Sequence, residues 1–412
     1  MWTAAFFFEL RTENHKHFPT TTSVPYRVHV RVVESRHFAN MFKRLIFYTL
    51  LIAQCVHSMR WEEVEVRQSP VPVRGEFTFQ KLDDESHELY LYGGCDITFS
   101  IFYNDLWLLS RVPGKNTMTW TQVETFGDKP VGSCGHGSAI VDGRMYVYGG
   151  LTANGTSNQF HKLDFHTLKW TKIQTSQPVR EVPPPRALIQ HSMVTTGVNT
   201  FVLGSGISSD KHDDDSTFQF NTDTALWERI SIGQIYNETD IGGSSISFDW
   251  QNKEAVLLGG YKKGTLDELG KLKINRQGAQ RWEKIPISTR NKPVGPIAFQ
   301  ASRMIYSNKS SCMLIDGGFN QDNLNANLWV LQFTSASLGG ASVSQNDRNG
   351  ILTASWKSLT TTNSPPPHFA SGFEILNNRY LYVFGGRIHP KGKGEELWGG
   401  LRRLNLDDYG IC

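Results

Sequence analysis

Arginine and histidine side chains stand just before several short apolar segments of this chain. Arg74, His136, Arg186, His191 and His368 share this position. Guanidinium groups bind carboxylates through charged, forked hydrogen bonds, so these residues predict a binding site for an acidic sugar or another carboxylate. The alternative for His136 and His191 is a structural role, in which each imidazole joins neighbouring units of the fold.

Other arrangements that could carry chemistry are incomplete. Residues 210–215, Asp-Lys-His-Asp-Asp-Asp, offer oxygen ligands and one imidazole, but they lack the glycine turn and distal glutamate of a calcium loop. No Gly-x-Ser-x-Gly, His-Glu-x-x-His, Cys-x-x-Cys or phosphate-loop pattern occurs in the chain. We therefore predict no catalytic residue, no metal site and no cofactor, and we expect the protein to act by binding.

The elements that must position these residues recur along the chain. An alternating apolar segment that ends in two glycines, as from Met145 to Gly150, predicts a half-buried strand followed by a turn with positive φ. Six copies are spaced by 56, 55, 55, 58 and 68 residues, with Gly204-Ser-Gly206 as the one irregular pair. Periods of about 40 to 55 residues in an all-strand pattern indicate propeller blades. The first glycines are Gly93, Gly149, Gly204, Gly259, Gly317 and Gly385.

A tryptophan at an outer-strand position follows each of the first five copies. None does so after the sixth, where Trp398 stands on the third strand. Trp61 begins a segment, residues 61–66, that resembles residues 120–125 of the first blade but has no glycine pair before it. We expect residues 61–66 to complete the last blade, because this closes the ring and removes an open sheet edge. We expect the five tryptophans to pack against their blades with much of each ring out of water. They are Trp120, Trp170, Trp227, Trp282 and Trp356.

The glycine pairs, the late tryptophans and an aromatic or apolar residue on each third strand resemble the kelch-repeat family over residues 61–412. The fold predicted for residues 59–412 is therefore all-β, a six-bladed kelch-type β-propeller closed by an N-terminal strand. The resemblance implies a module that binds a protein or a ligand through one propeller face. The alternative is a small-sugar enzyme similar to the exported sialic-acid mutarotases, an analogy that rests on architecture alone.

The residues before the propeller differ from the rest of the chain. Residues 1–40 show no strand or helix period, so we interpret them as a non-globular or misassigned N-terminal extension. Residues 41–58 begin with Met-Phe-Lys-Arg, continue with an apolar run and end in small residues, which predicts a secretory signal peptide and a secreted protein. The alternative is a buried strand or an anchor helix within a longer N-terminal domain.

Glycosylation triplets agree with export. They begin at Asn154, Asn237 and Asn308, each in a predicted loop. The net charge of +3 comes from interspersed acidic and basic residues and gives no basic face for nucleic acid. The apolar run within residues 41–58 is too short to span a membrane. We expect the protein to be a monomer.

Four cysteines remain once the predicted signal is removed, an even number that suits an exported protein. Cys95 follows the first glycine pair and Cys134 precedes the next blade, so propeller geometry predicts that they are neighbours and form a disulfide. Cys312 and Cys412 are the second candidate pair. The alternative for all four is a free, buried thiol.

Overall fold

The computed structural model contains strands and turns in all the parts that it describes, and these parts belong to one compact unit, Ser58–Cys412. The signal-peptide prediction for residues 41–58 and the extension at 1–40 lie outside the described residues, as do Asn237, Asn308 and Cys412. The described residues are 59–67, 71–115, 117–174, 182–208, 216–231, 235, 241–262, 268–273, 282–288, 295, 297–306, 311–320, 323–335, 352–389, 393–407 and 411.

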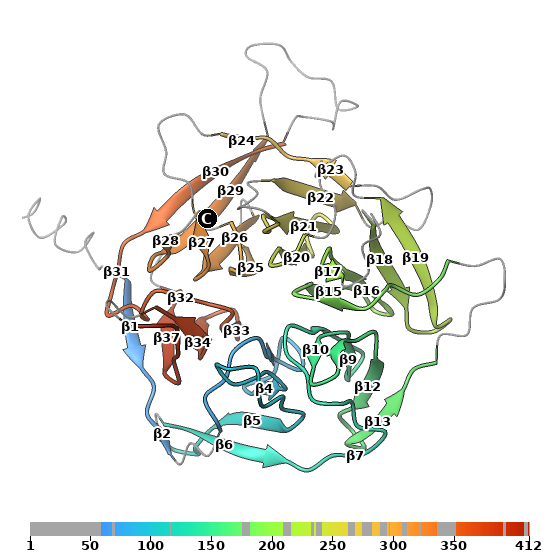
Figure 1. The fold of residues 1–412 in the computed structure, drawn as a ribbon. Coiled ribbons are helices and arrows are strands. Elements are labelled where there is room, and N and C mark those ends of the chain that lie inside the picture. Colours follow the sequence, from blue (N-terminus) through green and yellow to red (C-terminus); the bar gives the residue numbers. More distant parts are fainter. Residues whose placement is uncertain are drawn as a thin grey trace, which may run out of the picture. The chain divides into compact units, whose positions relative to one another are not determined.

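Six sheets of four or five strands make up most of the described chain, and Figure 1 shows them arranged around a common centre. The first three, each from the innermost strand outward, are β3 (Thr78–Gln80), β4 (Leu89–Tyr92), β5 (Leu106–Arg111), β6 (Met118–Val123) and β2 (Val66–Arg67); β8 (Gly137–Val141), β9 (Arg144–Tyr148), β12 (Phe160–Asp164), β13 (Lys169–Lys172) and β7 (Phe126–Gly127); and β15 (Met193–Gly197), β16 (Thr200–Leu203), β18 (Ser216–Asn221) and β19 (Leu226–Ser231). The other three are β20 (Ser245–Asp249), β21 (Glu254–Leu258), β22 (Leu269–Lys273) and β23 (Trp282–Lys284); β25 (Ala301–Tyr306), β26 (Ser311–Asp316), β29 (Leu328–Ser335), β30 (Leu352–Leu359) and β24 (Ile287–Ser288); and β33 (Gly372–Leu376), β34 (Tyr380–Phe384), β37 (Leu401–Asn405), β1 (Met59–Glu63) and β31 (Thr361–Thr362).

Short strands pair in the loops that follow the glycine pairs and in the segments that precede the inner strands. They are β10 (Leu151–Thr152) with β11 (Gly155–Thr156), β14 (Leu188–Ile189) with β17 (Ile207–Ser208), β27 (Phe319–Asn320) with β28 (Asn323–Leu324), and β32 (His368–Phe369) with β35 (Arg387–Ile388) and β36 (Glu396–Leu397).

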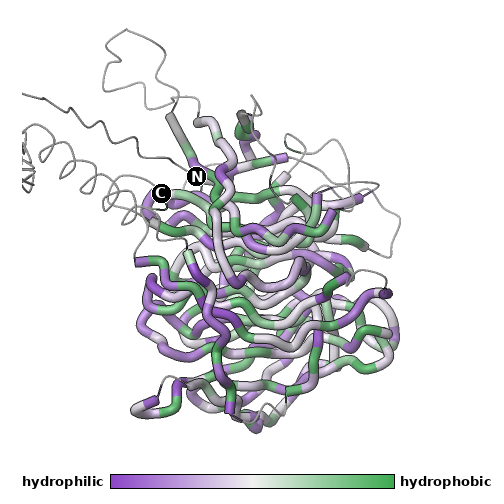
Figure 2. Tube along the Cα trace, turned by 90° about the vertical axis from the view of Figure 1, so that its left-hand side faces the viewer, coloured by the Kyte–Doolittle hydropathy of each residue, from purple (hydrophilic) through white to green (hydrophobic). Residues whose placement is uncertain are grey.

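The core lies between neighbouring sheets rather than in one central mass. Phe79 and Trp120 of one sheet pack with Phe384 of another, and their ring centroids are 5.1 to 6.5 Å apart. Figure 2 shows hydrophobic stretches alternating with hydrophilic ones along the described chain. Trp61 and the five tryptophans predicted to pack in the blades are all buried, which confirms that prediction.

The first described strand joins the last sheet. β1 pairs antiparallel with β37, so that Trp61, Glu62 and Glu63 lie opposite Leu404, Arg403 and Arg402. Both glutamates form ion pairs of 2.7 Å with the arginines opposite them. Cross-strand pairs of opposite charge stabilise this register and disfavour a shifted one.

The central channel has two ends, which we call the glycine face and the hairpin face. The glycine face carries the loops that precede the inner strands and follow the glycine pairs. The hairpin face carries the turns between each inner strand and the second strand of its sheet. The inner strands contact one another in the cyclic order β3, β8, β15, β20, β25, β33 and back to β3.

A ring of six backbone hydrogen bonds, which we call the belt, encircles the channel near the glycine face. Each belt residue donates its N–H to the carbonyl of the belt residue in the preceding sheet, over 2.7 to 3.3 Å, and the last bond returns to the start. All six have φ between +52° and +67°. That conformation is costly for Phe299, which persists in it because the surrounding bonds hold it there. The belt residues are Glu76, Gly135, Gln190, Gly243, Phe299 and Ala370.

Candidate functional site

Arg74 lies inside the fold. Its side chain is 0% exposed and donates from Nη1 and Nη2 to the two carboxylate oxygens of Asp105, over 2.6 and 3.0 Å. Nε donates to the Pro72 carbonyl, and the guanidinium carbon lies 3.8 Å from the centre of the Tyr103 ring. Burial alone would raise the pKa of Asp105, but Arg74 outweighs it and holds that pKa below its ordinary value. The Arg74 guanidinium therefore stabilises the fold at this point.

His368 stands at the matching position before β33 and is also buried. Nε2 lies 2.9 Å from Oδ2 of Asp316, and Nδ1 donates to the Pro366 carbonyl over 2.7 Å. Burial alone would lower the pKa of His368, but the facing carboxylate of Asp316 outweighs it and raises that pKa. The buried pair of His368 and Asp316 thus takes the place that Arg74 and Asp105 have before β3.

His136 and His191 bridge neighbouring inner strands as neutral rings. Nε2 of His136 is hydrogen-bonded to the Thr78 hydroxyl, 2.9 Å away, and Nε2 of His191 accepts from the Gly137 N–H, 3.1 Å away. Burial lowers the pKa of His136 to about 4. Burial, with His136 close by, lowers the pKa of His191 to about 3. This is the structural alternative that the sequence left open for both residues.

Arg186 is half-buried, and its backbone carbonyl accepts from the Tyr148 hydroxyl, 3.0 Å away. It makes a further side-chain or backbone interaction and is not a free cation. A further buried arginine, Arg387, lies 2.7 Å from Glu395 and 3.4 Å from Glu76 on the same face. Two of the predicted carboxylate-binding residues, Arg74 and His368, thus pair with Asp105 and Asp316 inside the fold. They do not line a common pocket.

Cys95 and Cys134 form the predicted disulfide, with their Cα atoms 5.4 Å apart. Cys312 is buried and takes part in a disulfide as well, while its predicted partner Cys412 lies outside the described residues. Asn154 is exposed at the turn between β10 and β11, where a glycan would have room. Its glycosylation stays a prediction.

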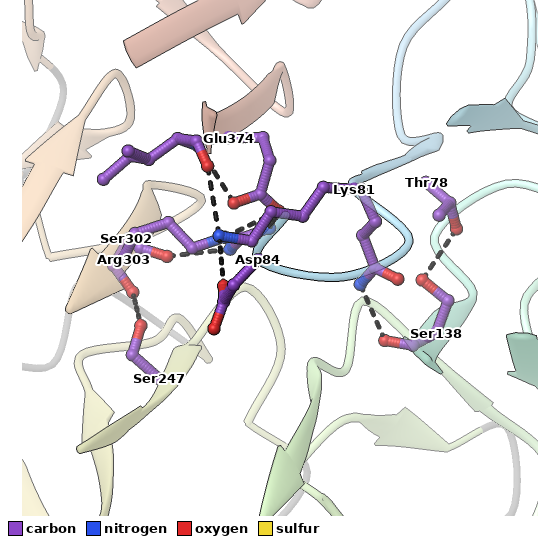
Figure 3. Close-up of polar contacts among 10 residues, drawn as sticks. Thr78, Lys81, Asp84, Ser138, Ser247, Ser302, Arg303 and Glu374 are labelled. Carbon is purple, nitrogen blue, oxygen red and sulfur yellow. Dashed lines mark hydrogen bonds and ion pairs between the residues drawn. The ribbon is translucent and has the colours of Figure 1, made fainter. Parts of the chain in front are cut away.

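A cavity of about 490 Å³ opens at the hairpin face and is lined by ends of the inner strands. Arg303 of β25 and Glu374 of β33 meet there, with Oε2 of Glu374 accepting from Nε over 3.2 Å and from Nη2 over 3.1 Å. Lys81 donates to the Ile375 carbonyl over 3.1 Å and lies 2.7 Å from Asp84 (Figure 3). The cavity has the size of a small-molecule site and converging charged groups.

A second cavity of about 170 Å³ adjoins the first, since both are lined by Gln80, Met193, Ile246 and Arg303. Hydroxyl and amide groups link the inner strands around it. Thr78 donates to Oγ of Ser138 over 2.8 Å, and the hydroxyl oxygens of Ser247 and Ser302 are 2.9 Å apart. Four residues of its lining each keep a buried side-chain oxygen without a partner among the described residues: Gln80, Ser192, Ser244 and Gln300.

Comparison with known proteins agrees with this architecture. The KLHDC2/KLHL20/DRC7 Kelch-repeats domain matches residues 45–260, more than half of the chain. The chain belongs to the kelch-repeat family. Kelch domain-containing protein 10 of Xenopus laevis is 28% identical over 257 residues, which are 61% of this chain and 59% of that protein. The human protein of that name is 27% identical over 234 residues, 56% of this chain and 50% of that protein.

A plant relative matches this chain over a smaller share of its own length. Acyl-CoA-binding domain-containing protein 5 of Arabidopsis thaliana is 27% identical over 227 residues, 54% of this chain but 33% of the relative. The chain thus spans between a third and about three fifths of the length of these relatives.

Exposed apolar side chains of this kelch domain gather on the glycine face. Among the described residues, five of the nine large hydrophobic side chains that are exposed lie in its loops, and two lie on the hairpin face. The two on the hairpin face are Val198 and Trp250. The five are Val73, Phe99, Ile101, Val131 and Tyr261.

In the part of the chain that the structure describes, no helix has the length and apolar character needed to cross a membrane. No group of three or more histidine, cysteine or acidic side chains there is placed to hold a metal ion.

Proposed function

We propose that this chain is a protein-interaction module, a six-bladed propeller closed by β1 that binds a protein partner through its glycine face. The belt, with one residue from each of six sheets, and the pairing of β1 with β37 support the architecture. The family supports interaction as the role. The comparisons do not favour the small-sugar enzyme alternative, because the family model is a Kelch-repeats domain and the first relatives are named as kelch domain-containing proteins.

The observation that carries the choice of face is the concentration of exposed apolar side chains there. Contiguous apolar surface rimmed by polar residues is typical of a protein-binding site, and loops on a rigid scaffold are where such sites occur. Two of the residues predicted to bind a ligand on this face, Arg74 and His368, are buried against Asp105 and Asp316. Apolar contacts therefore replace Arg74 and His368 as the expected basis of recognition.

The test is affinity capture with the folded domain as bait. Ile101, 53% exposed, and Tyr261 are changed together to Asp, and Val198→Asp on the hairpin face is the control, since Val198 is 80% exposed. We expect the double variant to lose captured partners at least about tenfold, and the control to keep them. Unfolding midpoints of all three proteins should stay equal. Partners lost with Val198→Asp and kept by the double variant would move the site to the hairpin face.

Export is a separate part of the proposal. The apolar run within residues 41–58 and the Cys95–Cys134 disulfide support it, because disulfides persist in oxidising compartments. Mass spectrometry of the native N-terminus tests it: a mature chain that begins near Met59 is expected. Recovery of peptides from residues 1–40 in the mature protein would contradict it.

A further inference from the structure

The Arg303 side chain keeps unused hydrogen-bonding capacity at the cavity of the hairpin face. An arginine has five N–H donors, and three of these are occupied: Nε and Nη2 donate to Glu374, and Nη1 donates to the Ser302 carbonyl. Within the described part of the chain, one N–H on Nη1 and one on Nη2 remain without an acceptor. These two terminal nitrogens together form the fork that matches the two oxygens of a planar carboxylate.

Lys81 adds a second donor to the same wall. Its ammonium group carries three N–H donors, and the Ile375 carbonyl and the Asp84 carboxylate account for two of them. The Asp84 side chain is 75% exposed, so this ion pair is screened by water and contributes little to stability. Asp84 is therefore a carboxylate that another carboxylate can displace at low cost.

The charges that line the cavity favour a singly charged anion. Glu374 is buried, and its two oxygens are filled by Arg303 and by the N–H of Ile375. Arg303 and Lys81 together exceed this one buried carboxylate by one positive charge. The other two acidic residues of the lining, Asp83 and Asp84, are exposed, so water screens their charges. An anion with one charge balances the wall, whereas a dianionic phosphate would overcompensate it.

Neutral polar groups lie next to this positive wall. Gln80 donates from Nε2 to the Ser138 carbonyl over 3.1 Å, and its Oε1 has no partner among the described residues. Figure 3 shows the Ser247 and Ser302 hydroxyls on the same side of the channel as Arg303. Hydroxyl and amide groups exchange hydrogen bonds readily with the hydroxyl groups of a ligand.

We propose that the hairpin-face cavity binds a small monocarboxylate that carries hydroxyl groups, of the size of a sugar acid. The Arg303 fork and the third N–H of Lys81 hold its carboxylate, and Gln80 with the neighbouring serines holds its hydroxyl groups. The cavity volume of about 490 Å³ accommodates such a molecule. This site is separate from the protein-binding face, and either proposal stands if the other fails.

Calorimetric titration of the purified chain with D-glucuronate tests the proposal, and D-glucuronamide is the matched probe that lacks the charge. We expect glucuronate to bind at least about tenfold more tightly than the amide. Arg303→Lys keeps the positive charge beside Glu374 but loses the fork, so it should weaken glucuronate binding by about tenfold. Arg144→Lys, on the same face but outside the cavity lining, should leave the affinity unchanged.

Asp84→Asn is expected to increase the affinity for glucuronate, and damage to the fold would not produce such an increase. Removing this exposed carboxylate frees Lys81, so glucuronate should bind more tightly, by about two- to fivefold. The proposal is overturned if glucuronate does not bind at millimolar concentration, if glucuronamide binds equally well, or if Asp84→Asn weakens binding. An Arg303→Lys protein that unfolds at the same midpoint and binds glucuronate as tightly as the parent would also overturn it.

Discussion

The two ends of the central channel use charged side chains in opposite ways. At the glycine face, Arg74 and His368 lie buried against carboxylates of their own chain, and the belt satisfies the backbone groups. At the hairpin face, Arg303 faces Glu374 but retains two donors beside a cavity. The same inner strands thus close the ring at one end and leave polar groups available to a ligand at the other. The role of a buried cation in a repeat protein therefore depends on how many of its hydrogen-bond donors are already used within the fold.

The variant with the largest expected effect tests closure of the ring. The difference between the glycine face and the hairpin face depends on that closure. Trp61 of β1 is 1% exposed and packs in a hydrophobic core cluster. Trp61→Ala should therefore lower the free energy of unfolding by about 3 to 5 kcal/mol. Trp250→Ala, at an indole 43% exposed on the hairpin face, should lower it by less than about 1 kcal/mol. Denaturant titration measures both. Equal losses would show that closure does not depend on β1.

A second variant asks whether the glycine-face arginine is purely structural. Arg74→Ala leaves Asp105 partly buried without its partner, which should cost about 3 kcal/mol of stability. The matched Arg144→Ala removes an exposed ion pair with Asp142 and should cost less than about 1 kcal/mol. Should Arg74→Ala keep its unfolding midpoint and lose a ligand instead, the distinction between the two ends would fail.

Acid should weaken the glycine-face end through its neutral histidines. The pKa values of His136 and His191 are lowered to about 4 and about 3, below the value of about 6.5 in an unfolded chain. Between pH 6.5 and 4 the unfolded chain therefore takes up protons that the folded chain does not. As the pH falls through this window, each histidine should lower the free energy of unfolding by up to about 1.4 kcal/mol per pH unit. Unfolding midpoints of a His136→Gln, His191→Gln protein should depend less steeply on pH there.

The smallest effect concerns His368 and has the opposite sign. Its pKa is raised, so the stability that it contributes is complete below pH 6.5 and is lost as the pH rises through the folded-state pKa. Asp316→Asn should remove this alkaline loss, because it takes away the facing carboxylate. The Arg74 and Asp105 pair should show no such loss, since arginine stays charged. Thermal unfolding from pH 6 to 9 compares the two.

Much of the fold could be predicted from the sequence, because it depends on local signals. Glycine pairs mark strand ends, tryptophans mark the core, and the order of the strands places Cys95 beside Cys134. The site could not be predicted in the same way. Arg303 and Glu374 are 71 residues apart and meet only because their strands face each other across two sheets. Their positions within β25 and β33 carry no motif.

The partners of the predicted site residues were equally hidden. Arg74 finds Asp105 31 residues later, and His368 finds Asp316 in the preceding sheet. The belt also escaped prediction, because four of its six residues adopt positive φ without being glycine: Glu76, Gln190, Phe299 and Ala370. Tertiary bonding imposes that conformation, and local sequence preference argues against it.

The belt determines how this protein can open locally. Each of its residues donates one bond and accepts another, so no single sheet can swing away without breaking two links at once. Local opening, which in linear repeat proteins begins at an end, has no end to begin from here. The six belt amides should then exchange their hydrogens with solvent at one common rate, as a single cooperative unit.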